Sequence, residues 1–253
     1  MLTLLVLVAA LVACVAGQRG GGAGSQHWKH GPTFGWRTSR SKSYIIEAET
    51  TLHPGLPPAG KLPRLALWPG LDTKDGLVQP IIVSTKKEEY AKCKTTETQW
   101  CVFASYLKYP LTQKMGNQVV MEGTDALTMK FKYNKTVGGY EQWLYLKGSM
   151  VSYVASPTGM SKSFYTDVEC QQDHVGVVKA HNYTETKITL SEADPQWGLN
   201  PSNHAMACAD KISTPDGGKT WIVPTIRVSE SVALRDYTNS GAVKPGPVIC
   251  AGR

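Results

Sequence analysis

The chain has 253 residues, of which 42% are hydrophobic and 19% are charged, and its formal net charge is +7. This composition is typical of a folded globular protein and excludes an intrinsically disordered chain. The positive charge is concentrated in residues 18–64. The rest of the chain therefore lacks the basic surface with which nucleic-acid-binding domains contact phosphates, and we expect no nucleic-acid partner.

The N-terminus reads as a secretory leader. Residues 1–16 carry no charged side chain, and small residues follow up to Gly17. An apolar run of this kind is typical of a signal peptide, which we place at residues 1–17. Arg19 follows too soon for a membrane-spanning helix, which needs about 20 apolar residues. We therefore predict a secreted, extracellular protein with no membrane span.

The next segment, residues 18–43, is rich in Gly, Ser and basic residues and shows no apolar period. Such a segment buries too little apolar surface to fold, so we predict a flexible basic arm. Its charge would suit an acidic polymer as partner.

From residue 44 onwards, short segments rich in β-branched and aromatic residues alternate with clusters of turn-forming residues. These segments predict strands over residues 44–49, 65–68, 77–84, 100–108, 118–121, 126–133, 141–146, 149–155, 164–170, 187–190, 211–212 and 221–229. The alternation is clearest where Leu127, Met129 and Phe131 fall on one face and Lys130 and Lys132 on the other. We predict an all-β fold, an antiparallel, jelly-roll-like β-sandwich. It forms a single domain over residues 44–235, with an irregular tail over residues 236–253.

Five cysteines follow the leader, and in an oxidising compartment they should largely pair. Cys93 and Cys101 are close enough in sequence to join the two strands of a hairpin. Cys170, Cys208 and Cys250 offer one further disulfide, for which we take Cys170 and Cys208 as candidates while the connectivity stays open. The odd thiol could link two chains as a disulfide-bonded dimer.

Two sequons predict glycosylation, at Asn134 and at Asn182. The cysteines and histidines lack the spacing of a metal site, and no glycine-rich phosphate loop precedes a helix. We therefore expect neither a metal nor a cofactor.

The most distinctive segment is a strand that ends in a Gly/Asp turn and is followed by a second strand. Trp68, Gly70, Leu71 and Asp72 form the first part, and Gln79 lies on the second strand. These residues resemble the start of the conserved region in the glutamic peptidase (eqolisin-like) family and its relatives among secreted concanavalin-A-like jelly rolls. The resemblance is good over about a dozen residues and loose over about a hundred.

The resemblance implies a catalytic pair. In that family the Gln is paired with a Glu on a neighbouring strand, and together they activate a water molecule. Gln79 would be the carboxamide here, and Glu169 is the first candidate for the carboxylate, with Glu141 as a second. Two departures count against the pair: Glu169 precedes Cys170 where the family has Trp, and Pro80 follows Gln79.

Three functions therefore compete. The main hypothesis is a secreted binding or matrix protein that engages a glycan or polymer on the concave sheet face, with Trp68, Asp72 and Trp143 as binding residues. The alternative is a glutamic-type endopeptidase that uses Gln79 and Glu169. A third, purely structural role would use the basic arm and the odd cysteine.

Overall fold

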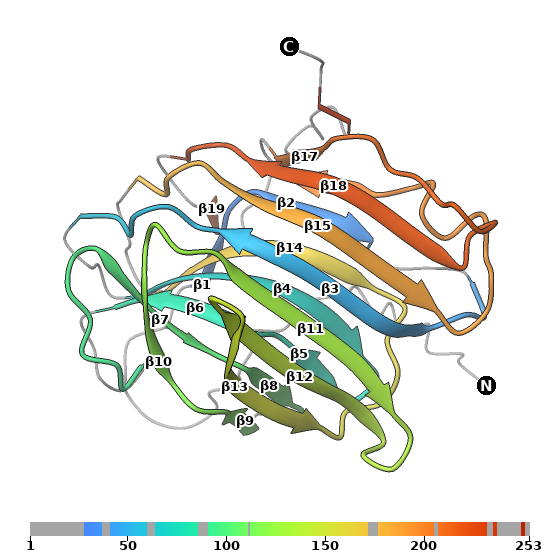
Figure 1. Ribbon diagram of the computed structural model, residues 1–253, viewed down its shortest axis with the longest axis horizontal. Coiled ribbons are helices and arrows are strands. Elements are labelled where there is room, and N and C mark those ends of the chain that lie inside the picture. Colours follow the sequence, from blue (N-terminus) through green and yellow to red (C-terminus); the bar gives the residue numbers. More distant parts are fainter. Residues whose placement is uncertain are drawn as a thin grey trace, which may run out of the picture.

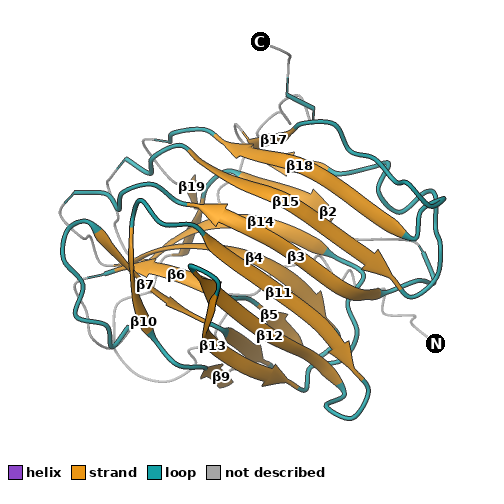
Figure 2. Ribbon diagram, in the orientation of Figure 1, coloured by secondary structure: helices purple, strands orange, loops and turns teal. Residues whose placement is uncertain are grey.

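The computed structural model describes residues 28–36, 41–59, 64–85, 91–110, 112–171, 177–204, 207–231, 235–236 and 249–250. Every regular element in these ranges is a β-strand, and the two sheets they form pack face to face (Figures 1 and 2). All paired strands within the sheets are antiparallel, which confirms the predicted antiparallel β-sandwich. Within the same ranges, no helix has the length and apolar character needed to cross a membrane.

The first sheet has twelve strands and contains the segment that resembles glutamic peptidases. Its central order is β10-β7-β6-β4-β14-β1-β19, with the remaining strands attached beside this path. Its strands are β1 (Trp28–His30), β2 (Thr33–Trp36), β4 (Arg64–Thr73), β5 (Gly76–Val78), β6 (Ile81–Ser84), β7 (Gln99–Phe103), β8 (Ser105–Lys108), β9 (Thr112–Met115), β10 (Val119–Glu122), β14 (Phe164–Gln171), β16 (Ser202–His204) and β19 (Arg235–Asp236).

The second sheet has seven strands in the order β13-β12-β11-β3-β15-β18-β17. Its strands are β3 (Ile45–His53), β11 (Leu127–Asn134), β12 (Gly139–Leu146), β13 (Ser149–Ser156), β15 (His181–Leu190), β17 (Ala207–Ala209) and β18 (Thr220–Val228).

The main core lies between the two sheets. Leu127, Met129 and Phe131 are buried there, as their alternation predicts, while Lys130 and Lys132 lie on the outer face of the second sheet. The first sheet is different, because a second buried cluster that includes Trp68 covers its outer face. Burial on both faces explains why the residues from Arg64 to Leu71 are buried without interruption.

Two disulfides are present, Cys93–Cys101 and Cys208–Cys250. The first is the predicted local pair. The second corrects the choice of Cys170 and Cys208, because the thiol of Cys170 is buried between the sheets, where it packs as an apolar side chain. Its burial also removes it from the surface, so this cysteine is not placed to link two chains.

Part of the predicted flexible arm is ordered. Residues 28–30 and 33–36 form β1 and β2, both of which pair with β14. Phe34 and Trp36 are buried in the main core. These two side chains supply buried apolar surface, which the overall Gly-rich and basic composition of the segment does not indicate. Residues 1–27 lie outside the described residues. The predicted strand at residues 211–212 is reduced to an isolated bridge between Ser213 and Ile222.

Candidate functional site

The acidic residue chosen from the sequence belongs to a polar row on β14. Tyr165, Asp167 and Glu169 alternate along this strand and therefore point to the same face of the first sheet. They lie on its outer face with Trp68, away from the second sheet. The row is buried, and Glu169 is only 3% exposed.

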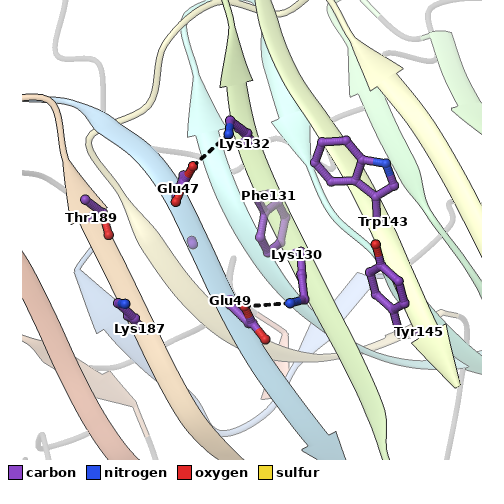
Figure 3. Close-up of a pocket in the computed structure, with 10 residues that line it drawn as sticks. Glu47, Glu49, Lys130, Phe131, Lys132, Trp143, Tyr145, Lys187 and Thr189 are labelled. Carbon is purple, nitrogen blue, oxygen red and sulfur yellow. Dashed lines mark ion pairs between the residues drawn. The ribbon is translucent and has the colours of Figure 1, made fainter. Parts of the chain in front are cut away.

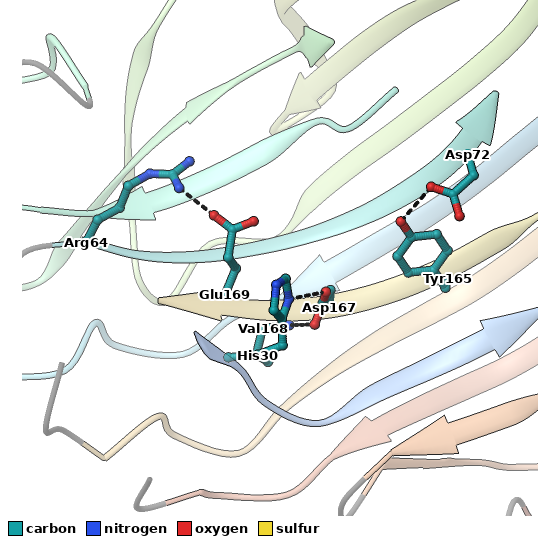
Figure 4. A network of polar contacts seen from close by, with 7 residues as sticks. All are labelled: His30, Arg64, Asp72, Tyr165, Asp167, Val168 and Glu169. Atoms are coloured by element: carbon teal, nitrogen blue, oxygen red, sulfur yellow. Dashed lines mark hydrogen bonds and ion pairs between the residues drawn. The ribbon is translucent and has the colours of Figure 1, made fainter. Parts of the chain in front are cut away.

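Each member of the row contacts a polar side chain on a neighbouring strand (Figure 4). The hydroxyl of Tyr165 donates to Asp72 Oδ1 at 2.9 Å, His30 Nδ1 lies 2.8 Å from Asp167 Oδ2, and Arg64 Nη1 donates to Glu169 Oε1 at 2.6 Å. The carboxylate of Glu169 is thus held by a guanidinium, in a buried ion pair between two strands.

Strand register decides how far Gln79 lies from Glu169. β5 and β6 pair with β4 in one continuous register, although Gln79 and Pro80 between them belong to neither strand. Continuing this register places Gln79 opposite Gly70. Gly70 in turn lies opposite Tyr165, whereas Glu169 lies opposite Ala66. Gln79 and Glu169 therefore share a face but are offset by four residues along the strands, about 13 Å at about 3.3 Å per residue.

The space above Gly70 is filled. A Cβ atom at this position would lie 2.7 Å from Cζ3 of Trp68, and the indole of Trp68 packs edge-on against Tyr165 at 5.5 Å. Trp68 is therefore a fully buried packing residue, and its indole fills the space above Gly70, which lies between Gln79 and Tyr165 in the strand register. Within the described residues, Gln79 Oε1 and Trp68 Nε1 are both buried without a hydrogen-bond partner.

The exposed face of the second sheet carries a different group of side chains. A single cross-strand row runs from β13 to β15, and its members stand directly opposite one another: Tyr153, Trp143, Lys130, Glu49 and Lys187. Directly opposed residues project to the same face, so all five meet the solvent side of this sheet. Sequence reasoning identified Trp143 alone, because the other members come together only through strand pairing.

An open hollow of about 450 Å³ lies over this row (Figure 3). Trp143 and Tyr145 stand side by side on β12 at one side of the hollow, and Lys187 and Thr189 on β15 stand at the other. Two ion pairs cross its floor, Lys130–Glu49 and Lys132–Glu47, each at 3.0 Å. Trp143 also packs against Tyr153, with 5.7 Å between ring centroids. The hollow thus combines an aromatic wall with a charged floor.

The three predicted binding residues do not form one site. Trp68 and Asp72 belong to β4 of the first sheet, whereas Trp143 belongs to β12 of the second. The prediction failed on this point because period-2 alternation assigns a residue to a face of its strand but not a strand to a sheet.

The two sequons occupy different settings. Asn134 ends β11, where its Oδ1 accepts from the backbone N–H of Thr136 and its Nδ2 donates to Glu141 at 2.9 Å. Hydrogen bonds from Tyr153 and Asn134 hold the pKa of Glu141 below its ordinary value. Asn182 lies near the start of β15, paired with His53 and Arg227. Glycosylation at either position stays a prediction.

Comparison with known proteins gives a resemblance in fold. No protein-family model matches the sequence, and none of the curated proteins does. Among solved structures, two of scytalido-glutamic peptidase with transition-state analogues are 10% identical, with TM-scores of 0.46 and 0.45. Each match covers 79% of this chain. It covers 98% of the first peptidase chain and 99% of the second. SCP-B, a member of the eqolisin family of peptidases in complex with a tripeptide, gives 10% identity, 79% and 98% coverage and a TM-score of 0.39.

The resemblance is distant. It agrees with the resemblance to glutamic peptidases noted around Trp68 and Gln79. At this level of similarity the likeness concerns the fold alone.

Proposed function

We propose that this protein binds a glycan across the outer face of the seven-stranded sheet, with the peptidase-like sandwich as its scaffold. The observation that carries the proposal is the cross-strand row in which Trp143 and Tyr153 stand in register with Lys130, Glu49 and Lys187. Aromatic rings stack on the apolar faces of sugar rings, and charged side chains bond to hydroxyl groups. The face offers both in one open hollow.

The dimensions of the row favour a polymer over a single sugar. From β12 to β15 the row crosses three strand-to-strand steps, about 14 Å at about 4.8 Å per step. An extended glycan could lie along it with one sugar on Trp143 and another near Lys187. The predicted signal peptide would carry the protein to the extracellular space, where such polymers occur.

A glycan array followed by calorimetry on the best ligand tests this proposal. Trp143→Ala should weaken binding by at least about tenfold, because it removes the aromatic surface on which the sugar stacks. Tyr109→Ala is the matched control, since Tyr109 is 39% exposed and follows β8 of the first sheet, whereas the row lies on the second. Equal binding by the wild type and Trp143→Ala would refute the site.

A second candidate function is glutamic-type endopeptidase activity. It is favoured by Gln79, whose buried carboxamide oxygen has no hydrogen-bond partner among the described residues and which shares a face with Glu169. In such a mechanism the carboxylate takes a proton from water while the carboxamide holds the water and the developing oxyanion. The offset of about 13 Å along the strands and the Arg64 ion pair both oppose that arrangement.

Incubation with a denatured protein substrate between pH 3 and pH 7 separates the two candidates. The binding proposal expects no cleavage beyond that of the substrate alone. Cleavage that disappears in both Glu169→Gln and Gln79→Leu but persists in Trp143→Ala would establish the peptidase instead. Both substitutions need a circular dichroism spectrum like that of the wild type, because Glu169 and Gln79 are buried.

A further inference from the structure

A second hollow, of about 630 Å³, lies near the edge of the seven-stranded sheet formed by β18 and β17, and its wall includes Ile249, the neighbour of the disulfide-bonded Cys250. Its walls include Leu199, Ile212, Trp221 and Ile249, with Lys211 beside them. Leu199 is 57% exposed and Ile249 is 48% exposed, although both are large apolar residues. A volume of this size is within the range of small-molecule sites, and walls of this kind are typical of them.

The floor of this hollow is closely packed. Trp221 packs so closely on Gly198 that a Cβ atom there would lie 2.2 Å from the indole Cε3. The carbonyl of Gly198 accepts a hydrogen bond from Trp36 Nε1 at 3.1 Å, which fixes the loop from the other side. Trp221 Nε1 is buried and lacks an acceptor within the described part of the chain. The hollow is therefore built on a closely packed aromatic platform.

One wall is attached through the disulfide. The backbone N–H of Cys250 donates to Ala209 at 2.8 Å, and Ile249 forms a bridge with the same residue. The Cys208–Cys250 bond joins this short segment to β17. Ile249 thus keeps its place in the wall through both a covalent link and a backbone hydrogen bond.

The charge beside the hollow is positive. Lys211 contributes a cation and takes part in none of the ion pairs among the described residues. The adjacent carboxylate, Asp210, is occupied by Arg227 through two hydrogen bonds of 3.1 and 3.0 Å. An anionic group entering the hollow would therefore meet an ammonium whose charge is not neutralised by Asp210.

We propose that this hollow binds a small amphipathic anion, namely a carboxylate or sulfonate that carries an alkyl or aromatic body. The body would lie against Leu199, Ile249 and Trp221, and the anionic group would lie at Lys211. This site is separate from the glycan row, which lies over β11, β12, β3 and β15. The inference stands whether or not the glycan proposal holds.

Fluorescence of 8-anilinonaphthalene-1-sulfonate, with decanoate as competitor, tests the site at pH 7.5 on the full chain with its disulfides intact. The dye should bind at one site per chain and be displaced by decanoate but not by decanol at equal concentration. Leu199→Ser should weaken dye binding by about tenfold or more, and Lys211→Gln should weaken both the dye and decanoate, because each carries the anionic group that would lie at Lys211. Met150→Ser is the matched control, because Met150 is also 57% exposed but lies on β13.

Three outcomes would overturn the proposal. The first is dye binding unchanged by both Leu199→Ser and Lys211→Gln, and the second is equal displacement by decanol. The third is co-sedimentation with phosphatidylglycerol vesicles that Leu199→Ser abolishes, which would assign the surface to a membrane lipid instead of a free amphiphile. Crosspeak shifts of the Trp221 indole in a ¹H–¹⁵N spectrum provide a readout that does not depend on the dye.

Discussion

At the scale of single residues, His181 makes the stability of the fold depend on pH. It is fully buried, and its Nδ1 lies 3.0 Å from the carbonyl oxygen of Lys179, while Nε2 has no hydrogen-bond partner within the described residues. Burial lowers its pKa from 6.5 to about 4 because the charged imidazolium would be poorly solvated in the core. The folded chain therefore prefers the neutral imidazole.

The sign of the effect follows from this shift. As the pH falls from 6.5 towards 4, the unfolded chain binds a proton at His181 and the folded chain does not, so the free energy of unfolding decreases. We expect a loss of about 3 kcal/mol that levels off below about pH 4. Urea titrations at pH 7.5, 5.5 and 4 should show this loss in the wild type and a smaller one in His181→Leu. His53→Gln, at an exposed histidine, should behave like the wild type.

At the scale of elements, the ion pair between Arg64 and Glu169 joins β4 to β14 at the centre of the first sheet. Both side chains are less than a tenth exposed, so removing one leaves the other charge in a poorly solvated place. Arg64→Met should lower the free energy of unfolding by about 3 kcal/mol or more, and adding Glu169→Gln should restore part of it.

Lys132→Met serves as the control for the buried pair. Its ion pair with Glu47 has the same type of partners, but both side chains are more than half exposed. Such exposed pairs contribute less than about 1 kcal/mol. Urea denaturation measures the free energy of unfolding of both variants. Equal decreases for Arg64→Met and Lys132→Met would show that the Arg64–Glu169 ion pair is not a main link between β4 and β14.

At the scale of the whole molecule, the two disulfides restrict very different lengths of chain. Cys93–Cys101 spans 8 residues and Cys208–Cys250 spans 42. A disulfide restricts the unfolded chain more when it closes a longer loop. Removing Cys208–Cys250 should therefore lower the free energy of unfolding by about 4 kcal/mol, and removing Cys93–Cys101 by about 2.5 kcal/mol.

Thermal unfolding of the double variants Cys208→Ala/Cys250→Ala and Cys93→Ala/Cys101→Ala measures this difference. The variant without the longer link should unfold at the lower temperature. The burial of Cys101 in the second apolar cluster works against this order, because its replacement also removes packing. The reverse order would therefore mean that packing around Cys101 outweighs loop entropy.

Several features could be predicted because they depend on neighbouring residues. Alternating apolar side chains specify a strand with one buried face, which is why residues 127–133 were assigned correctly. The Cys93–Cys101 disulfide could also be predicted, since its two cysteines are separated by only 8 positions in the sequence. The strands β1 and β2 were missed, because their apolar residues are spread through a Gly-rich, basic segment without a period.

The sequence by itself determined that this is an all-β chain, which residues on each strand share a face, and that a segment around Trp68 and Gln79 resembles glutamic peptidases. Only the tertiary structure decided that Tyr165, and not Glu169, is in register with Gln79 on the other side of β4. It also decided that Trp143 shares a cross-strand row with Lys187. The physical reason is strand register. It depends on hydrogen bonds between segments far apart in the chain, and a shift of a few residues along a strand moves side chains by many ångströms without changing the alternation that the sequence displays.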